Sequence, residues 1–570
     1  MRKIVRVNMT QKKVDTEDTI EKYRLLGGRA LTCAILNDEV SPSCDPFRHH
    51  NKLVIAPGLL AGTPLSSASR LSIGGKSPLT GGIKEANAGG TAAFNLAKLN
   101  IKAIIIEGES KTVSPQYLYI NNEIAELRPA EFVYKGMFES ARLLYDRYGK
   151  RVSIILIGPA GERGFPISGI SSTDREGRPT RFAARGGLGA VMGLKGLKAI
   201  VIDPEGASGV SYKDKKSFYG VVKELTKALI ENPITSEYYP KYGTAPMVTR
   251  TNALKALPTR NFSQGSFEFE PYLNGKYLYH IITTRGGDGN PTHACMPGCI
   301  VKCSNIYPDS SGRELVSPIE YETIGLIGAN CGIGNLDDIA KLNYICNDLG
   351  IDTIEVGATI GVLMGQNVIS FGDVTAAERL LMEIKNNTLL GRVLGQGTLI
   401  AGRVFGAKRI PVVKGQAIAA YDPRSLKGYG VTYATSAMGA DHTAGPTISA
   451  EEKLDGSDSK IVVEISRNAQ INSAIIDSLG LCLFAFVALT QHAKELAEAV
   501  KYLYGGNFSS EKLIQMGKQV ILDECRFNHK AGLGPAHNRL PEFMLEEPLP
   551  ETNEVFDVPQ AELDAIFKNL

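Results

Sequence analysis

Apolar residues in the first two hundred positions fall in short runs rich in β-branched side chains, a pattern typical of β-strands. Five runs predict strands: Lys3–Met9, Lys52–Ala56, Ala103–Glu107, Ser153–Ile157 and Ala199–Ile202. Tyr117–Ile120 and Ile124–Leu127 flank Asn121-Asn122-Glu123, which predicts a hairpin. Glycine is dense in the same region, so we expect tight turns and backbone that can approach a ligand closely.

Helical spacing dominates further along the chain. Apolar side chains repeat at this spacing from Ile339 to Leu349, and Gly350 is placed to end that helix. Thr375 and Glu378 predict a capping box before the apolar run that follows them.

Two breaks divide the chain into three predicted domains. The stretch DPEGASG at 203–209 is rich in turn-forming residues, and a second boundary is expected near 405–410. We therefore predict an α+β protein in which a strand-rich N-terminal domain precedes two mainly helical domains. The predicted domains are 1–205, 206–410 and 411–570.

One apolar stretch, Ile471–Thr490, has the length of a membrane span. Asn472, Asp477 and Ser478 interrupt it, so we predict a buried core segment and no membrane span. Asp477 would then be a buried carboxylate, which requires a charged partner or a functional role.

Composition narrows the class of protein. The 570 residues are 43% hydrophobic and 22% charged, with a net charge of +3, as in an ordinary globular protein. So small a charge argues against a general binder of nucleic acid or membrane surfaces. The N-terminal sequence has no apolar run long enough for a secretory signal, so we expect a cytoplasmic protein. In that setting nine cysteines favour a metal site over disulfides.

Three cysteines form the strongest local signal. Cys295, Cys299 and Cys303 lie close together, and Pro297-Gly298 forces a loop between the first two. Four ligands are usual, so a remote fourth cysteine is expected. Cys482 is favoured for its apolar, buried setting; the other candidates are Cys33, Cys44, Cys331, Cys346 and Cys525. Spacing alone leaves open an iron–sulfur cluster, structural zinc or core cysteines without a metal.

Arginine occurs among glycines in two separate segments. Arg70 lies in SSASRLSIGG, Arg181 and Arg185 lie in TRFAARGGLG, and NAGG at 87–90 belongs with them. Guanidinium groups and Gly-rich backbone both bind phosphate, so a phosphorylated cofactor is one interpretation. Surface arginine beside turn glycine is the other. A dinucleotide or P-loop site is disfavoured because neither glycine motif is present.

Two similar hexapeptides occur at 347–352, NDLGID, and at 477–482, DSLGLC. They could hold two similar halves of one ligand. Alternatively, they are ordinary helix ends with glycine just beyond the last turn.

Glu322 and His442 are the candidate acid and base. Glu322 precedes the apolar run IGLIG, so burial is expected to raise its pKa toward a value that suits a general base. His442 follows a Gly-rich turn in GADH, although a lone histidine is more often structural.

Together and in this order, these segments resemble the aldehyde:ferredoxin oxidoreductase family of tungsten enzymes. The resemblance runs nearly end to end and includes KSPLTGGIKEANAGG, RGGLGAVMGLKGLKAI, EYETIGLIGAN, LGIDT, GADH and DSLGLCLF. It implies the catalytic subunit of an enzyme that oxidises aldehydes to carboxylic acids, with tungsten or molybdenum held by two pterin dithiolenes. It also implies one [4Fe-4S] cluster and electron transfer to ferredoxin or an iron–sulfur partner subunit.

The resemblance assigns residues to each cofactor. The pterin phosphates, bridged by Mg²⁺ on the backbone carbonyls of Asn87 and Phe182, would contact Arg70, Asn87, Gly89, Arg181, Phe182, Ala184 and Arg185. The pterin rings would contact Asn347, Asp352, Asp477, Leu481 and Leu483. The cluster ligands would be Cys295, Cys299, Cys303 and Cys482. Glu322 would take a proton from the attacking water, and His442 would donate a hydrogen bond to the oxygen on which charge develops.

Three features depart from the family pattern. The cysteine spacing is C-x3-C-x3-C rather than C-x2-C-x3-C, and Asn347 replaces an aspartate. Lys341 and Tyr344 stand where some family members carry the ligands of an iron site between subunits, so we predict no such iron. Whether the chain forms a homo-oligomer stays open.

Two kinds of alternative remain. A member of the same family could act on hydroxycarboxylates or aryl-CoA thioesters instead of aldehydes. A non-catalytic iron–sulfur or zinc subunit would have lost Glu322, His442 or the arginines, and all of these are present.

Overall fold

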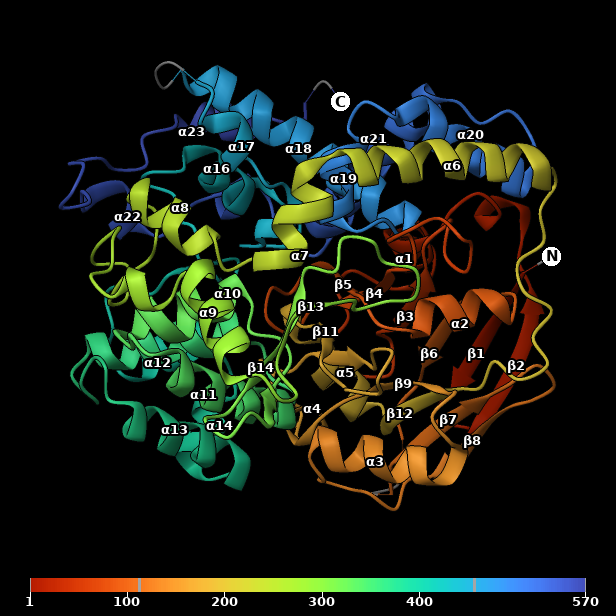
Figure 1. Ribbon diagram of the computed structural model, residues 1–570, viewed down its shortest axis with the longest axis horizontal. Coiled ribbons are helices and arrows are strands. Elements are labelled where there is room, and N and C mark those ends of the chain that lie inside the picture. Colours follow the sequence, from red (N-terminus) through yellow and green to blue (C-terminus); the bar gives the residue numbers. More distant parts are fainter. Residues whose placement is uncertain (1, 111–113, 455–457, 569) are drawn as a thin grey trace.

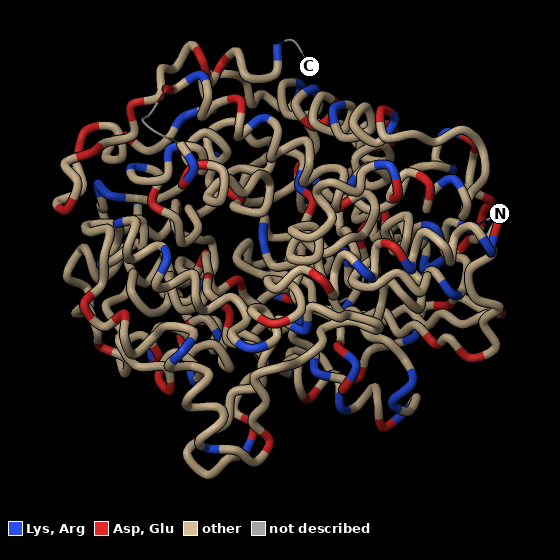
Figure 2. The backbone as a smooth tube through the Cα atoms, turned by 45° about the horizontal axis from the view of Figure 1, so that its top comes forward, with Lys and Arg blue, Asp and Glu red and all other residues tan. Residues whose placement is uncertain are grey.

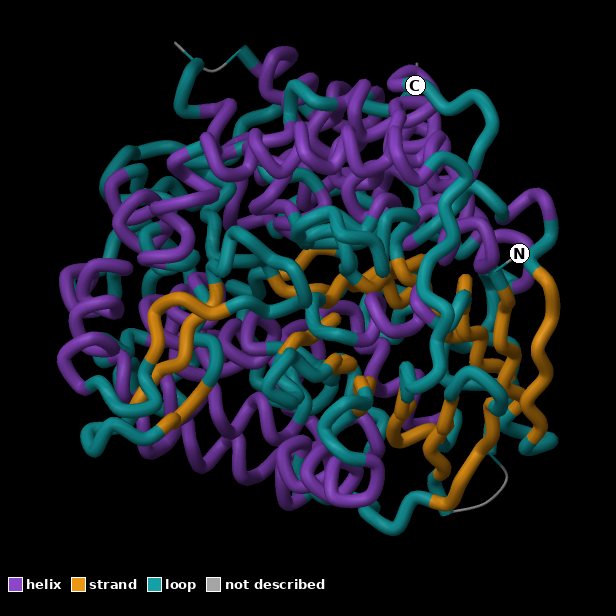
Figure 3. Tube along the Cα trace, turned by 45° about the vertical axis from the view of Figure 1, so that its right-hand side comes forward, coloured by secondary structure: helices purple, strands orange, loops and turns teal. Residues whose placement is uncertain are grey.

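The computed structural model describes residues 2–110, 114–454, 458–568 and 570. Two β-sheets occupy the N-terminal third, and helices form most of the rest of the described chain (Figures 1 and 3). The predicted α+β class, with a strand-rich beginning and mainly helical segments after it, is confirmed.

The first sheet has six strands in the order β2-β1-β6-β3-β4-β5, with β1 and β6 parallel and the other neighbours antiparallel. Their bounds are β1 Lys3–Asn8, β2 Lys13–Asp18, β3 Leu53–Pro57, β4 Leu71–Lys76, β5 Ile83–Ala88 and β6 Ile101–Glu107. The three strands predicted in this region are confirmed as β1, β3 and β6.

The second sheet has the order β11-β10-β9-β12-β7-β8, with β7 and β12 parallel. Its strands are β7 Gln116–Ile120, β8 Ala125–Pro129, β9 Ser153–Leu156, β10 Ile170–Ser172, β11 Arg181–Ala183 and β12 Leu197–Ile202. The predicted hairpin is confirmed, with Ile120 opposite Ala125. The side-chain oxygen of Asn121 accepts the backbone N–H groups of Glu123 and Ile124, which fixes the turn.

The two sheets share one hydrophobic core between their facing sides. On β6, Ile104 and Ile106 join this core, whereas Ala103 and Ile105 pack against α1 (Gly28–Glu39) on the opposite face, because successive side chains of a strand alternate. The outer face of the second sheet packs on α3 (Met137–Tyr148). At one end the edge strands β5 and β11 lie against each other.

Helices and short strands complete the chain. Those that accompany the sheets are α2 Ala92–Lys98, α4 Pro159–Glu162 and α5 Leu188–Leu194. The next segment contains α6 Lys215–Glu231, α7 Tyr239–Tyr242, α8 Met247–Ala253, α9 Gly275–Arg285, β13 Asn290–His293, β14 Ser304–Pro308, β15 Glu314–Val316, α10 Tyr321–Thr323, α11 Leu336–Leu349, α12 Thr353–Gly365, α13 Val374–Asn386, α14 Leu389–Leu394 and α15 Thr398–Val404. The last contains β16 Val412–Val413, β17 Gln416–Ala417, α16 Lys427–Thr435, α17 Ile448–Glu451, α18 Ser459–Leu479, α19 Leu483–Leu489, α20 Ala493–Tyr504, α21 Ser510–Lys530, α22 Glu542–Glu546 and α23 Gln560–Ala565.

One hydrophobic core runs through both segments that were predicted as helical domains. Leu257, Ile327 and Ala358 share it with Tyr429 and Phe556. The division of the chain at 405–410 therefore stays a prediction.

Local helix signals were partly right. The predicted helix is α11, and Gly350 follows it with a φ of +74°. The predicted capping box is wrong, because α13 begins at Val374 and Asp373 is its N-cap, accepting the N–H of Ala376 at 2.9 Å. Thr375 already lies inside the first helical turn, so it cannot occupy the extended backbone position that a cap needs.

The apolar stretch at 471–490 is divided between two helices. α18 ends at Leu479, Gly480 follows it with a φ of +79°, and α19 begins at Leu483. Within the described ranges no single helix is long and apolar enough to cross a membrane; α18 and α19 pass the test only as a pair, bent by 109°. Figure 2 shows acidic and basic residues mixed across the molecule, in keeping with the small net charge.

Candidate functional site

The structure brings four cysteines together. Cys295, Cys299 and Cys303 lie on the loop between β13 and β14, and Cys482 is the N-cap residue of α19. Burial and the neighbouring Cys482 thiol raise the pKa of Cys303, and a hydrogen bond with Cys299, followed by burial, raises that of Cys295. Of the other candidates for the fourth position, Cys33, Cys331 and Cys346 lie in separate hydrophobic cores.

Ser67 joins two of these cysteines and was missed in the sequence. Its hydroxyl donates to Cys299 Sγ at 3.4 Å, and its carbonyl accepts the N–H of Cys482 at 2.8 Å. Its φ of +57° lies in the left-handed region, which serine rarely adopts. The only sequence signal was its position three residues before Arg70.

The first arginine segment lies beside the cysteines. Arg70 donates to the side-chain oxygen of Asn87 and, at 3.3 Å, to its carbonyl. A Cβ added at Gly89 would lie 3.2 Å from Cys295 Sγ and 3.8 Å from Arg70 Nη1. The absence of a side chain at Gly89 therefore allows this backbone to approach both groups.

The second arginine segment lies at the same end of the sheets, because edge strands β5 and β11 meet there. Arg181, on β11, donates to Ser304 Oγ at 2.7 Å and to Asp174 at 3.2 Å. Arg185 donates to Asp352 at 3.2 Å and to the Ala417 carbonyl at 2.6 Å. Phe182 is half-buried on β11, and the half-buried Ala184 directly precedes Arg185.

Both hexapeptides end a helix with a glycine, as the simpler interpretation predicted: Gly350 after α11 and Gly480 after α18. An aspartate in each hexapeptide nevertheless contacts an arginine. Asp352 pairs with Arg185, and Asp477 lies 3.4 Å from Arg29. Leu481 is buried, and Leu483 is half-buried at the start of α19. The two interpretations of these peptides are therefore compatible.

Glu322 and His442 face each other, with 3.5 Å between Glu322 Oε1 and His442 Nε2. The N–H of Ala420 donates to the other carboxylate oxygen at 2.9 Å. Burial raises the pKa of Glu322, as expected from its apolar surroundings, and His442 opposes this shift. The Tyr421 ring lies 5.9 Å from His442, centroid to centroid, and stacks on Tyr429, so aromatic rings form one wall of the site.

A buried charge network surrounds this region. Arg29 forms a two-point pair with Glu524, with both nitrogen–oxygen distances 2.8 Å. Burial raises the pKa of Asp477 to about 6, against the opposing effect of Arg29. Burial, together with Asp477, raises the pKa of Glu85 to about 8. Glu85 was missed, because it lies on β5 beside other polar residues, Lys84 and Asn87, and nothing in the local sequence sets it apart.

Several buried polar atoms in this region lack a hydrogen-bond partner among the described residues. They are Arg181 Nε, Glu322 Oε1, Asn347 Nδ2, Gln416 Oε1 and His442 Nδ1. A buried polar group without a partner is costly, so such atoms indicate a missing polar ligand. The donors and acceptors present therefore fit a large polar group that carries phosphate.

Asp174, Glu176 and His293 form a further group, with ligand atoms within 4.8 Å of one another. Arg181 already contacts it, 3.2 Å from Asp174 and 3.1 Å from His293 Nδ1. The guanidinium supplies the positive charge there, which disfavours a bound cation.

Comparisons with known proteins agree along nearly the whole chain. Residues 4–204 match the family model of the aldehyde ferredoxin oxidoreductase N-terminal domain, and residues 220–569 match that of domains 2 and 3. A tungsten-containing aldehyde ferredoxin oxidoreductase from Pyrococcus abyssi is 35% identical over 96% of this chain and 92% of its own length. The WOR-like subunit of an aliphatic sulfonate oxidoreductase from Pyrococcus furiosus is 27% identical over 91% of this chain and 84% of its own.

A solved structure shares the fold. It is the active-site complex BamBC of benzoyl coenzyme A reductase with 1,5-dienoyl-CoA. The TM-score is 0.81 at 21% identity, covering 100% of this chain and 94% of that chain.

Proposed function

This chain belongs to the aldehyde ferredoxin oxidoreductase family, and on that premise we propose that it is a catalytic subunit that oxidises an aldehyde to a carboxylic acid. The observation that carries the proposal is the pair formed by Glu322 and His442. Each has a buried polar atom with no partner in the described protein, and the two side chains face each other beside the arginine segments. Relatives named as tungsten-containing favour tungsten over molybdenum.

The bis-pterin cofactor would be held where the edge strands of the two sheets meet. We assign its phosphates to Arg70, Asn87, Gly89, Arg181, Phe182, Ala184 and Arg185, with Mg²⁺ on the carbonyls of Asn87 and Phe182. We assign its rings to Asn347, Asp352, Asp477, Leu481 and Leu483. When bound, this group supplies a Lewis acid for the carbonyl and accepts two electrons. Support comes from the buried atoms without partners, Arg181 Nε and Asn347 Nδ2 among them.

We assign an iron–sulfur cluster, rather than zinc, to the four cysteines. Tetrahedral zinc with bonds of about 2.3 Å places its sulfurs about 3.8 Å apart. Among the described residues, no three of these cysteines have Sγ atoms within 4.8 Å of one another. A [4Fe-4S] cluster is larger than a single zinc ion and takes four cysteine thiolates, which Cys295, Cys299, Cys303 and Cys482 would supply.

The protein's own groups can handle the protons of the reaction. An aldehyde and water give a carboxylic acid, two protons and two electrons. The Ala420 N–H fixes one oxygen of Glu322, which leaves Oε1 to accept a proton from water. Its raised pKa makes Glu322 a stronger base than an ordinary glutamate, which favours the role of general base. His442 Nδ1 has no partner in the described chain and can donate to the substrate oxygen.

The electrons would leave through the cluster to ferredoxin or an iron–sulfur partner subunit. Asp477 and Cys482 belong to one short segment around Gly480, so one piece of chain serves both the proposed ring site and the cluster. Gly89 gives a second close approach, because its backbone lies against Cys295.

Metal content tests the proposal. Protein purified without oxygen is expected to contain about one tungsten or molybdenum and about four irons per chain, and to reduce benzyl viologen when an aldehyde is added. If the protein contained only zinc, although its host can make the pterin cofactor, the proposed catalytic function would be refuted. The alternative of a non-catalytic subunit stabilised by zinc would then remain. Full metal content with turnover of a sulfonate, hydroxycarboxylate or aryl-CoA thioester, but of no aldehyde, would reassign the substrate class.

A further inference from the structure

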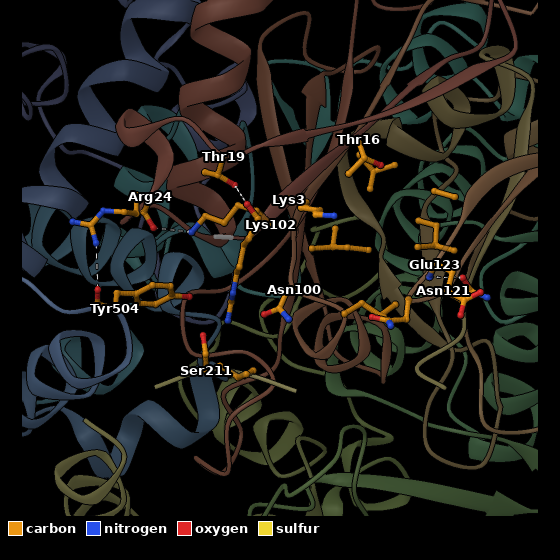
Figure 4. Close-up of a pocket in the computed structure, with 18 of the residues that line it drawn as sticks. Lys3, Thr16, Thr19, Arg24, Asn100, Lys102, Asn121, Glu123, Ser211 and Tyr504 are labelled. Carbon is orange, nitrogen blue, oxygen red and sulfur yellow. Dashed lines mark hydrogen bonds between the residues drawn. The ribbon is translucent and has the colours of Figure 1, made fainter. Parts of the chain in front are cut away.

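A cavity with a volume of about 850 Å³ lies away from the candidate functional site (Figure 4). It is lined by the start of β1, the start of β6, the turn between β7 and β8, the segment 210–213 before α6 and the end of α20. None of the residues assigned above to the cofactors or to the reaction lines it. Its volume lies in the range of small-molecule sites.

The walls of this cavity carry an excess of positive charge. The basic lining residues are Arg2, Lys3, Arg24, Lys102 and Lys213, and the acidic ones are Glu21 and Glu123. Glu21 pairs with Arg24 at 2.7 Å, so the remaining four cations face one carboxylate. This composition contrasts with the small net charge of the whole chain, which is +3.

Two of the basic side chains have no acidic partner among the described residues: Lys102, which is buried, and Arg2, which is half-buried. Lys102 is 2% exposed, and its ammonium group donates to the carbonyl of Arg24 at 3.0 Å rather than to a carboxylate. Burial, together with the charges of Arg2 and Arg24, lowers the pKa of Lys102. Arg2 Nη2 is buried and has no hydrogen-bond partner in the described part of the chain. Buried basic groups are normally paired with an acid, so Lys102 and the buried Arg2 Nη2 both lack the anionic partner that is usual for such groups.

Aromatic packing holds these two cations in place. The Tyr504 ring lies 5.4 Å from the Arg2 guanidinium and 5.3 Å from Lys102 Nζ. The Tyr504 hydroxyl donates to the Leu59 carbonyl at 2.8 Å, and Arg24 donates to the Tyr504 carbonyl at 3.3 Å. Figure 4 shows Arg24, Lys102 and Tyr504 grouped on one side, with Asn121 and Glu123 on the other. The basic groups are therefore fixed before any ligand arrives, which lowers the entropy cost of binding.

We propose that this cavity binds a small phosphate-bearing anion, with Arg2 and Lys102 as the central contacts. Phosphate oxygens match the fork of an arginine and the point charge of a lysine. Arg2, Lys3 and Lys213 already outnumber the one unpaired carboxylate, and an anion bound beside Lys102 would favour the protonated form of that lysine. The cavity therefore suits a ligand with two or three negative charges, such as an organic diphosphate, better than a monocarboxylate. Bound there, the ligand would join segments that are far apart in the sequence, near Arg2 and near Tyr504, and would stabilise the fold.

The test uses holoenzyme purified without oxygen and pyrophosphate as the probe. At constant ionic strength, the thermal unfolding midpoint is expected to rise with pyrophosphate concentration and to rise less with inorganic phosphate. Arg2→Gln and Lys102→Met should each weaken pyrophosphate binding about tenfold. Lys223→Gln, on the exposed face of α6, removes the same charge outside the cavity and should bind as the wild type does.

Three results would overturn the proposal. The first is an equal affinity for pyrophosphate in wild type and in Arg2→Gln. This comparison can still be made if Lys102→Met does not fold. An equal rise with chloride at matched ionic strength is the second, because it would show a general salt effect. The third is sedimentation with phosphatidylglycerol vesicles, but not with phosphatidylcholine vesicles, without any response to pyrophosphate. That outcome would assign the cations to a lipid surface.

Discussion

Replacing Glu322 with glutamine isolates the proposed proton acceptor. Glutamine keeps the shape of the side chain, and its amide oxygen can still accept the Ala420 N–H, which lies 2.9 Å from Glu322 in the structure. The amide cannot take a proton from water. A positioned general base contributes roughly 10²–10⁴-fold, so kcat is expected to fall by that factor, which corresponds to about 3–5 kcal/mol of barrier. Folding should not suffer, because the change removes a buried charge that has one oxygen without a partner.

The assay is aldehyde-dependent reduction of benzyl viologen, with tungsten and iron measured on the same preparation. Burial raises the pKa of Glu322, so wild-type kcat should fall as the pH drops through that raised pKa and the base becomes protonated. In Glu322→Gln, kcat should not show this fall at low pH. Glu320→Gln is the matched control, since that carboxylate bonds Thr244 at 2.6 Å instead of facing His442. Loss of metal in Glu322→Gln, or an unchanged kcat, would refute the assignment of the base.

Three further changes probe the surroundings of the site. Glu524→Gln should lower stability by about 3–5 kcal/mol, since it leaves Arg29 buried without its two-point partner; a shift below about 1 kcal/mol in chemical denaturation would contradict this. Gly89→Ala places a methyl group 3.2 Å from Cys295 Sγ, so the iron content or the electron paramagnetic resonance spectrum of the cluster should change. If neither changed, the cysteine loop would have moved to accommodate the methyl group, which would contradict the prediction. Glu85 has a folded pKa raised to about 8, so the stability it contributes is full below the unfolded pKa and is lost as the pH rises through about 8. The free energy of unfolding of Glu85→Gln, relative to that of wild type, should therefore be higher at pH 9 than at pH 5, by a few kcal/mol. Chemical denaturation at both pH values measures it, and an equal difference at pH 5 and pH 9 would contradict the reasoning.

Much of the fold could be predicted because strands and helices leave local periodic patterns. The runs that became β1, β3, β6, β9 and β12 are short and β-branched, and Gly350 ended α11 where its position indicated. The capping box at Thr375 failed because Asp373, two residues earlier, supplies a better cap, and the sequence does not show which cap wins. Sheet order was out of reach for a similar reason. It depends on which strands pair, and strand pairing is decided by contacts between segments far apart in the chain.

The chemistry-bearing residues divide in the same way. The cysteine loop, the Arg/Gly segments and the two hexapeptides were visible because their residues are neighbours in sequence. Ser67, Glu85 and the Arg29–Glu524 pair were not, because each matters through a partner on another element. The basic cavity was equally hidden, since Arg2 and Tyr504 are far apart in the sequence and come together only in the fold.

By itself, then, the sequence determined the kinds of element, the resemblance to a family and the side chains able to hold metal and phosphate. Tertiary structure decided that β5 and β11 meet edge to edge, so that Arg70 and Arg181 reach one region. It also placed Glu322 3.5 Å from His442, across 120 residues of chain. The physical reason is that local propensity acts over a few residues, whereas the position of a side chain in space is fixed by the packing of whole sheets and helices around shared cores.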